Sequence, residues 1–211
     1  SEKERDLFNA MGSMYAAVLL IGIKNSTSVQ PVVSVERTVV IELPYVFVQS
    51  VVYGFIVYAM IGFEWHVAKV LWFLFFMYFT FLYFTYYGMM AVAVTPNNHI
   101  STIVSSAFYS VWNLFSGFVI PRPRIPVWWR WYSWINPVAW SLYGLVASQY
   151  GDVKHNIDTN DGRQTVEGFV RNYFGFKHDF LGVVAVVNVA FPIAFALVFA
   201  ISIKMFNFQR R

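Results

Sequence analysis

The chain has 211 residues with a formal net charge of +4, and 58% of them are hydrophobic, 20% aromatic and only 12% charged. A soluble globule of this size would carry about 25% charged residues, so this composition argues against one and favours the bilayer as solvent. The basic residues form no stripe, which argues against a nucleic-acid partner, and the absence of cysteine excludes disulfides and thiolate chemistry.

Crossing the hydrocarbon core as a helix takes roughly 20 apolar residues, because lipid offers no partner to unpaired backbone groups. The sequence starts with charged residues at positions 2–6 and shows neither a signal peptide nor an initiator Met. This start predicts a segment of a longer chain. Three apolar stretches then follow in order, at residues 7–29, 41–63 and 67–94. Pro44 lies in the first turn of the second stretch, where a missing N–H is tolerated.

Residues 95–98 (TPNN) end the third stretch, and two more predicted spans follow at residues 100–120 and 180–206. The fourth is stopped by residues 121–124 (PRPR). The third span holds eleven aromatic residues between Trp72 and Tyr87. They surround the helix rather than mark one face, so we interpret them as lipid contact and helix packing and not as a stack for flat cargo. Small residues at helix-packing spacing occur in three pairs: Gly12/Ala16, Ala190/Ala194 and Ala196/Ala200.

The long segment of residues 121–179 separates the last two spans. Its Trp- and Arg-rich part, residues 127–134 (VWWRWYSW), is typical of headgroup depth. Residues 138–150 are apolar but too short to span, which predicts a re-entrant or interfacial helix. Residues 152–164 read as a solvated loop. An amphipathic turn follows, with Val166, Phe169, Val170 and Phe174 on one side.

The predicted fold is therefore an all-α integral membrane bundle of five transmembrane helices plus a re-entrant helix. Counting Lys and Arg, the face with the C-terminal tail and the 24–40 loop carries five, and the opposite face carries ten. The positive-inside rule would then place residues 121–179 in the cytosol. That segment is about as long as the rule tolerates, so the charge count leaves the orientation open.

The sequence predicts no catalytic residue, no metal site and no cofactor site in this chain. It contains no phosphate-binding glycine loop and no Gly-x-Ser-x-Gly elbow, and its four histidines have no ligand spacing. Glu42 and Glu64 lie at the ends of the second span, where a carboxylate costs little, which argues against a proton-coupled carrier.

Several strings resemble the plant full-size pleiotropic-drug-resistance transporters, which belong to the G subfamily of ABC transporters. They are residues 7–31 (LFNAMGSMYAAVLLIGIKNSTSVQP), 41–63 (IELPYVFVQSVVYGFIVYAMIGF), 87–96 (YGMMAVAVTP), 113–134 (NLFSGFVIPRPRIPVWWRWYSW) and 204–211 (KMFNFQRR). The resemblance covers essentially the whole chain and corresponds to the C-terminal part of the second transmembrane domain.

The resemblance implies an ATP-driven exporter of amphipathic small molecules, usually in the plasma membrane. It implies that residues 121–179 are extracellular and the C-terminal tail cytosolic, against the charge count, and we adopt the family's orientation. ATP and magnesium would be bound by nucleotide-binding domains that this chain lacks. Those domains and the other transmembrane half are the implied partners, in cis or in trans.

By the same resemblance, the first and fourth spans line the translocation path. The implied path residues are Leu19, Leu20, Ile23, Ser105, Phe108, Tyr109, Trp112 and Asn113. Phe118 and Val119 match the apolar plug below the extracellular exit. For each residue the alternative is ordinary helix packing, and for Asn113 it is an interhelical hydrogen bond.

The sequence departs from the family between Glu36 and Leu43, where about twenty basic and aromatic residues that form a cytosolic elbow in the family are missing. An alternative splice or a mispredicted gene would produce this join. Two functions therefore remain open: a pore segment that is inactive without nucleotide-binding domains, and a non-transporting membrane fragment that at most associates with full-length subunits.

Overall fold

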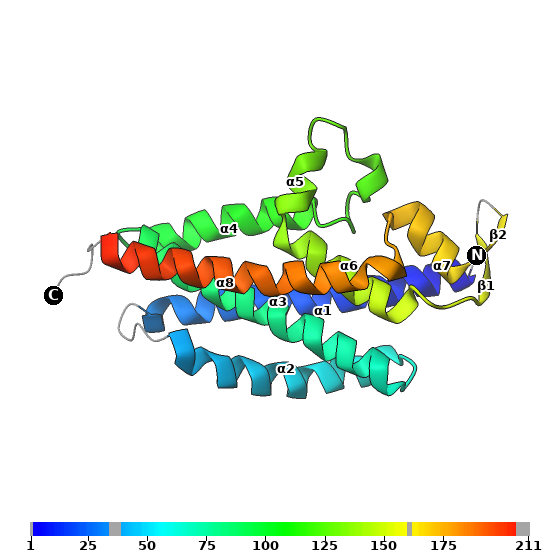
Figure 1. Ribbon diagram of the computed structural model, residues 1–211, viewed down its shortest axis with the longest axis horizontal. Helices are drawn as coiled ribbons and strands as arrows, with labels where there is room; N and C mark the ends of the chain where they lie inside the picture. The colour runs from blue at the N-terminus through cyan, green and yellow to red at the C-terminus, as the bar shows by residue number, and fades with distance from the viewer. Residues whose placement is uncertain (1, 34–38, 160–161, 206–211) are drawn as a thin grey trace.

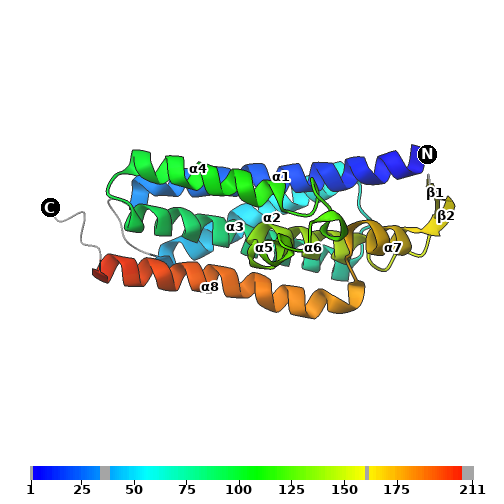
Figure 2. The same ribbon diagram turned by 90° about the horizontal axis from the view of Figure 1, so that it is seen from above.

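The structure, a computed structural model, describes residues 2–33, 39–159 and 162–205. Its long helices run side by side as an elongated bundle (Figures 1 and 2). They are α1 (Glu2–Val33), α2 (Val39–Ile61), α3 (Val67–Val94), α4 (Asn98–Leu114) and α8 (Leu181–Met205). The sequence join near Thr38 lies outside the described residues.

Four of the described helices are long and apolar enough to cross a membrane: Glu4–Val32, Val40–Ile61, Val67–Val94 and His178–Met205. These match the first, second, third and fifth predicted spans, and the bounds of the third are those predicted. The first helix continues to Val33 instead of ending near residue 29. The chain is therefore a predominantly helical membrane protein.

The fourth predicted span, residues 100–120, is too long. The helix α4 has 17 residues and ends at Leu114, so it is not among the four candidate spans. Gly117 follows with φ +98°, a left-handed conformation that favours glycine and that no helix continues through. The sequence motif at residues 121–124, which predicted the stop, begins seven residues beyond the end of α4.

The third helix, α3, is the centre of the bundle and contacts α1, α2, α4, α6 (Pro137–Tyr150) and α8. Its aromatic side chains face these neighbours: the rings of Phe73, Phe76, Phe81 and Tyr83 are fully buried. The interpretation of the third-span aromatics as helix packing is therefore confirmed. Because aromatic side chains bury the largest areas, they fix the contacts of this central helix.

Two glycines let α1 approach α3 closely. A Cβ atom on Gly22 of α1 would lie 2.4 Å from the ring of Phe84. A Cβ atom on Gly88 of α3 would lie 2.5 Å from the backbone oxygen of Ser26. Gly22 thus leaves room for a ring of α3, and Gly88 lets α3 approach the backbone of α1, which only a residue without a side chain allows.

The long segment after α4 folds into short elements that extend from the middle of the bundle to the end where α1 begins (Figure 1). They are η1 (Arg122–Arg124), α5 (Arg130–Ile135), α6, β1 (Asn156–Thr159), β2 (Gly162–Thr165), α7 (Val166–Phe169), η2 (Val170–Phe174) and η3 (His178–Phe180). The strands form an antiparallel hairpin in which Asn156 pairs with Thr165. The all-α prediction missed this hairpin, which lies where the sequence suggested a solvated loop.

The predicted apolar helix at residues 138–150 is helical as α6, and all of its residues except Tyr150 are buried. It starts at Asn136-Pro137, a pair suited to a helix N-terminus. The Asn136 side chain accepts a hydrogen bond from the Val138 N–H at 3.1 Å and donates to the Trp112 carbonyl at 2.8 Å. Asn136 thereby ties α6 to the end of α4.

The predicted apolar side of residues 166–174 is also buried, with Val170 and Phe174 almost inaccessible.

Candidate functional site

The outward surfaces of α2 and α8 are almost wholly apolar. Along α2 the exposed large side chains are Val40, Ile41, Tyr45, Phe47, Val48, Val52, Phe55, Ile56 and Met60. Along α8 they are Val183, Val186, Ile193, Leu197, Val198, Ile201 and Met205. Surfaces of this kind suit lipid chains, which offer no hydrogen bonds.

The outward face of α1 is different. Apart from Arg5 and Val32 near its ends, its exposed residues recur three or four positions apart and therefore share one face of the helix; they are Asp6, Asn9, Ser13, Ala16, Leu20, Lys24, Ser28 and Pro31. Lys24 lies eight residues before Val32, or about 12 Å inside that end of the span. A charged or amide side chain that faces lipid at such depth is costly, so this face suits water or protein.

The exposed surface of α4 also carries a polar line, formed by Thr102, Ser106, Ser110 and Asn113. Their spacing places them on one face of the helix. The hydroxyls of Ser106 and Ser110 donate to carbonyls four residues earlier, at 2.7 and 2.9 Å. Their oxygens remain on the surface and keep acceptor capacity. Figure 2 shows α4 and α1 along one long side of the molecule and α8 along the other. We call these exposed residues of α1 and α4 together the polar face.

Beneath the polar face, hydrogen bonds join α1 to α4 over most of their shared length. Gln30 is central at one end: its Nε2 donates to Ser105 Oγ at 3.2 Å, and its Oε1 accepts from Thr102 Oγ1 at 2.9 Å. The hydroxyls of Ser26 and Tyr109 hydrogen-bond to each other in the middle. These bonds keep the two helices in register.

At the other end of this contact, the Tyr15 hydroxyl donates to the Asn113 side-chain oxygen and, at 3.3 Å, to the Asn113 backbone carbonyl. The interhelical hydrogen bond considered for Asn113 is therefore present. Asn113 is also exposed, so part of its surface stays open beside the Tyr15 contact.

The structure divides the remaining path candidates into an outward and an inward group. Leu20 is 64% exposed and Phe108 49% exposed, and Ile23 is half-buried. The inward group is buried and comprises Leu19, Ser105, Tyr109 and Trp112. The ring of Trp112 contacts Tyr87, with 4.6 Å between centroids, and stacks on Phe195 at 6.3 Å. This inward group packs the helices together.

The two plug candidates lie just past the end of α4 and differ in exposure. Val119 is 55% exposed. The half-buried Phe118 stacks on Tyr15, with 5.2 Å between ring centroids, and its Cζ atom would lie 3.2 Å from a Cβ on Gly12 of α1. Phe118 therefore fills the gap between the loop after α4 and α1.

A partly buried amide pair joins α1 to α2. Asn25 Nδ2 donates to Gln49 Oε1 at 2.9 Å, and Gln49 Nε2 donates to Asn25 Oδ1 at 2.8 Å. A cavity of about 380 Å³ lies beside this pair, lined partly by Ser28, Glu42 and Thr85. Asn25 is the first residue of the sequon Asn25-Ser26-Thr27, and its side chain is already paired inside the bundle.

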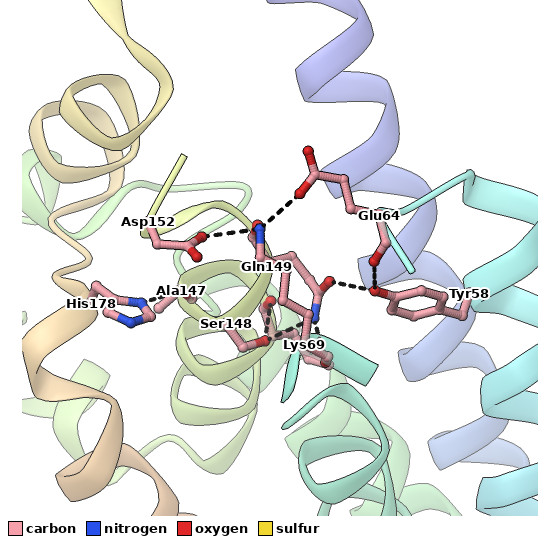
Figure 3. A network of polar contacts seen from close by, with 9 residues as sticks. Tyr58, Glu64, Lys69, Ala147, Ser148, Gln149, Asp152 and His178 are labelled. Carbon is pink, nitrogen blue, oxygen red and sulfur yellow. Dashed lines mark hydrogen bonds and ion pairs between the residues drawn. The ribbon is translucent and has the colours of Figure 1, made fainter. Parts of the chain in front are cut away.

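A polar network closes the opposite end of α2 and α3 (Figure 3). The Lys69 ammonium lies 3.3 Å from Glu64 Oε2, 3.1 Å from Asp152 Oδ1 and 3.2 Å from the Gln149 carbonyl. The Gln149 side chain donates to the Lys69 carbonyl at 2.9 Å and accepts from the Tyr58 hydroxyl at 3.3 Å. A cation is well placed at the C-terminus of α6, where carbonyls lack helical partners. The network thus locks α6 onto the turn between α2 and α3.

Among the described residues, no group of three or more His, Cys, Asp or Glu side chains could hold a metal ion. Sequence reasoning missed Gln30, Thr102, Ser106 and Ser110, which a helical-wheel count of hydroxyl and amide residues along residues 98–114 and 25–30 would have found. The sequence analysis also counted Lys24 only as a positive charge in the loop after the first span.

The comparisons with known proteins assign the chain to a family. The family model described as ABC-2 type transporter matches residues 38–150, more than half of the chain. ABC transporter G family member 37 from Oryza sativa subsp. japonica is 62% identical over 231 residues, covering 100% of this chain and 16% of that protein. Pleiotropic drug resistance protein 1 from Nicotiana tabacum is 62% identical over 229 residues, with 99% and 16% covered.

ABC transporter G family member 40 from Arabidopsis thaliana is 57% identical over 231 residues, again covering 100% of this chain and 16% of the relative. The chain thus spans about a sixth of the length of these relatives. The resemblance read from the five sequence strings is confirmed, and the matched region is a membrane domain. The chain belongs to the ABC-2 type transporter family, within the plant pleiotropic-drug-resistance transporters of the ABC G group.

Proposed function

We propose that the chain is one side of the translocation path of an ATP-driven exporter of amphipathic small molecules in the plasma membrane. The path runs along the polar face, with Leu20 and Phe108 as apolar contacts for cargo. The helix α4 and the loop after it together cross the membrane, in addition to the four long helices. The helix α6 is re-entrant, and residues 121–179 are extracellular. ATP and magnesium act on nucleotide-binding domains supplied by other segments or partners.

The observation that carries this proposal is the contrast between the outward faces of the helices. The outward side chains of α2 and α8 are almost wholly apolar, whereas those of α1 and α4 place hydroxyls, amides and charged groups among exposed apolar side chains such as Ile103, Phe108 and Leu114. A wall of this mixed kind suits amphipathic cargo, which gains from burial of its apolar part and needs few fixed hydrogen bonds.

The first prediction tests the orientation. We expect Asn25 to stay unglycosylated, because it lies inside α1 toward the cytosolic end and its amide is paired with Gln49. Glycosidase treatment of the chain expressed in plant microsomes should leave its mass unchanged, and Asn25→Gln should not alter this. The matched control is Asp158→Thr, which gives Asn156 a sequon in the proposed extracellular segment and should add a glycan. A glycan on Asn25 would reverse the orientation and favour the charge count.

The second prediction tests the path. The chain lacks cysteine, so single cysteines can be introduced without background, in a cysteine-free full-length relative that carries this segment with the relative's own connection between α1 and α2. Ser13→Cys, Ser106→Cys and Ser110→Cys should react with a hydrophilic thiol reagent at least about tenfold faster than lipid-facing cysteines, because only the hydrated thiolate is reactive.

Val48→Cys on α2 and Val186→Cys on α8 are the matched controls, since both residues are also exposed on the bundle surface, at 60% and 70%. An amphipathic cargo should slow the reaction at Ser106→Cys and leave the controls unchanged. Equal reaction rates on all four helices would contradict a path along α1 and α4.

A further inference from the structure

The sequence motif at residues 121–124 has a structural role beyond ending the fourth span. The guanidinium of Arg122 sits inside a box of four aromatic rings. Its Cζ atom lies 5.6 Å from the ring centroid of Trp134, 5.1 Å from Trp140, 5.2 Å from Tyr143 and 5.7 Å from Phe176. All four distances are within the range at which a cation is attracted by an aromatic face.

No carboxylate from the described part of the chain shares this box. The Nε and Nη2 atoms of Arg122 are buried, and no described residue accepts a hydrogen bond from them. Burial lowers the pKa of Arg122 from its usual value to about 10, although the nearby Tyr143 opposes this shift. The guanidinium therefore keeps its charge at neutral pH, and the four rings are its described partners. An arginine is suited to this because its flat, weakly hydrated cation stacks on rings, whereas a lysine ammonium holds its water.

The walls of the box are fixed by hydrogen bonds of their own. Trp140 Nε1 donates to the Trp134 carbonyl at 2.8 Å. The Tyr143 hydroxyl accepts from the Lys177 N–H at 2.7 Å and donates to the Lys177 carbonyl at 3.2 Å. The box therefore joins α5 and α6 to the segment that follows η2. Arg122 inserts between these elements from the loop that follows α4.

That loop carries Phe118 only four residues before Arg122. Its backbone is bent at Gly117, whose added Cβ would lie 4.0 Å from Arg122 Cγ and 3.7 Å from Phe176 Cζ. Ser116 Oγ, which is buried, accepts a hydrogen bond from the Phe118 N–H at 3.3 Å. The loop is thus held at one end by Arg122 and presses Phe118 against α1 at the other.

We propose that Arg122 is a positioning residue that clamps the loop after α4 in the aromatic box and thereby holds Phe118 against Gly12 and Tyr15 of α1. Its consequence for transport rests on the proposed plug role of Phe118, but the clamp itself does not. Loss of the clamp lets the loop lift away from α1 while the helices of the bundle stay packed.

The test uses Ser116→Cys as the reporter, an isosteric change at a buried position beside Phe118. In the full chain in nanodiscs, the reporter should react slowly with a hydrophilic thiol reagent. Adding Arg122→Lys should raise its reaction rate by about tenfold, because a lysine keeps the charge and loses the stacking. The matched control is Arg124→Lys, since Arg124 is exposed and faces a single ring, Tyr173, at 5.0 Å.

Monodispersity and tryptophan fluorescence report whether each variant keeps its fold. If Arg122→Lys does not fold, Phe176→Leu removes one wall of the box and should give a smaller increase in the rate. An unchanged rate in the folded variants would overturn the clamp, as would an equal increase with Arg124→Lys. If Arg122→Lys makes the Ser116→Cys reporter react faster but cargo does not leak through a full-length relative with the same change, the clamp is supported and the plug role of Phe118 is wrong.

Discussion

Replacing Gly88 with alanine is expected to force α1 away from α3 and to lower the thermal stability of the chain. The new Cβ atom would lie 2.5 Å from the backbone oxygen of Ser26 and 2.6 Å from its Oγ. A backbone oxygen cannot rotate out of the way, so the helices must shift. Overpacking of this kind costs about 1–3 kcal/mol, and more where the obstacle is rigid. The shift would also strain the hydrogen bond between Ser26 and Tyr109 that joins α1 to α4.

The matched control is Gly182→Ala in α8, where an added Cβ meets no atom within 4 Å. Alanine stabilises a helix by about 1 kcal/mol relative to glycine, so this variant should unfold at the same or a higher temperature. Thermal unfolding in nanodiscs, followed by tryptophan fluorescence, compares the two variants with the unchanged chain. Equal midpoints for Gly88→Ala and Gly182→Ala would show that α1 and α3 do not touch as the structure has them.

The bounds of the apolar helices could be predicted from the sequence because length and composition mark a span. The third span is the clearest case: its start and its end at Val94 lie where the apolar run meets polar residues. The fourth was drawn too long because Phe115, Phe118, Val119 and Ile120 continue the apolar composition past Leu114. Hydropathy does not register the backbone of Gly117, which turns the chain there.

The packing contacts could not be predicted from spacing alone. Of the small-residue pairs chosen from the sequence, Ala190/Ala194 and Ala16 lie exposed, whereas the close approaches use single glycines such as Gly22 and Gly88. A small residue permits a close contact, but only the neighbour's position decides whether one forms. The same reason hid the division of the path candidates, because Phe108 and Tyr109 adjoin in sequence and yet one is exposed and the other buried.

The role of Arg122 was hidden for a related reason. In sequence, residues 121–124 read as prolines that stop a helix, and the aromatic residues at positions 127–134 read as a headgroup belt. The structure leaves Trp128 and Trp131 exposed, as such a belt requires, but turns one side of Trp134 toward Arg122. Its partners Tyr143 and Phe176 lie 21 and 54 positions further along the chain than Arg122, too far for any local pattern to connect them.

The last prediction concerns the connection between α1 and α2. We expect this connection to decide whether the segment can transport at all. The alignment with the rice relative runs over 231 positions against the 211 residues of this chain, which leaves 20 positions of that relative without a counterpart. The resemblance expects about twenty residues of a cytosolic elbow at this connection. Here α1 ends at Val33 and α2 begins at Val39, a separation that two antiparallel helices can bridge.

We therefore expect this segment, grafted into a complete relative without an elbow, to insert normally and to give no ATP-dependent efflux above a hydrolysis-deficient control. The elbow would lie at the cytosolic headgroups and supply the surface on which a nucleotide-binding domain presses. Its loss should therefore uncouple ATP hydrolysis from the movement of cargo along the polar face. The same graft with the relative's elbow restored is the matched comparison and should export cargo from vesicles. Protease protection should give the same fragments for both grafts, which separates a coupling defect from misinsertion. Comparable efflux from both would show that the short connection is harmless, whereas no efflux from either, with insertion intact, would favour a non-transporting fragment.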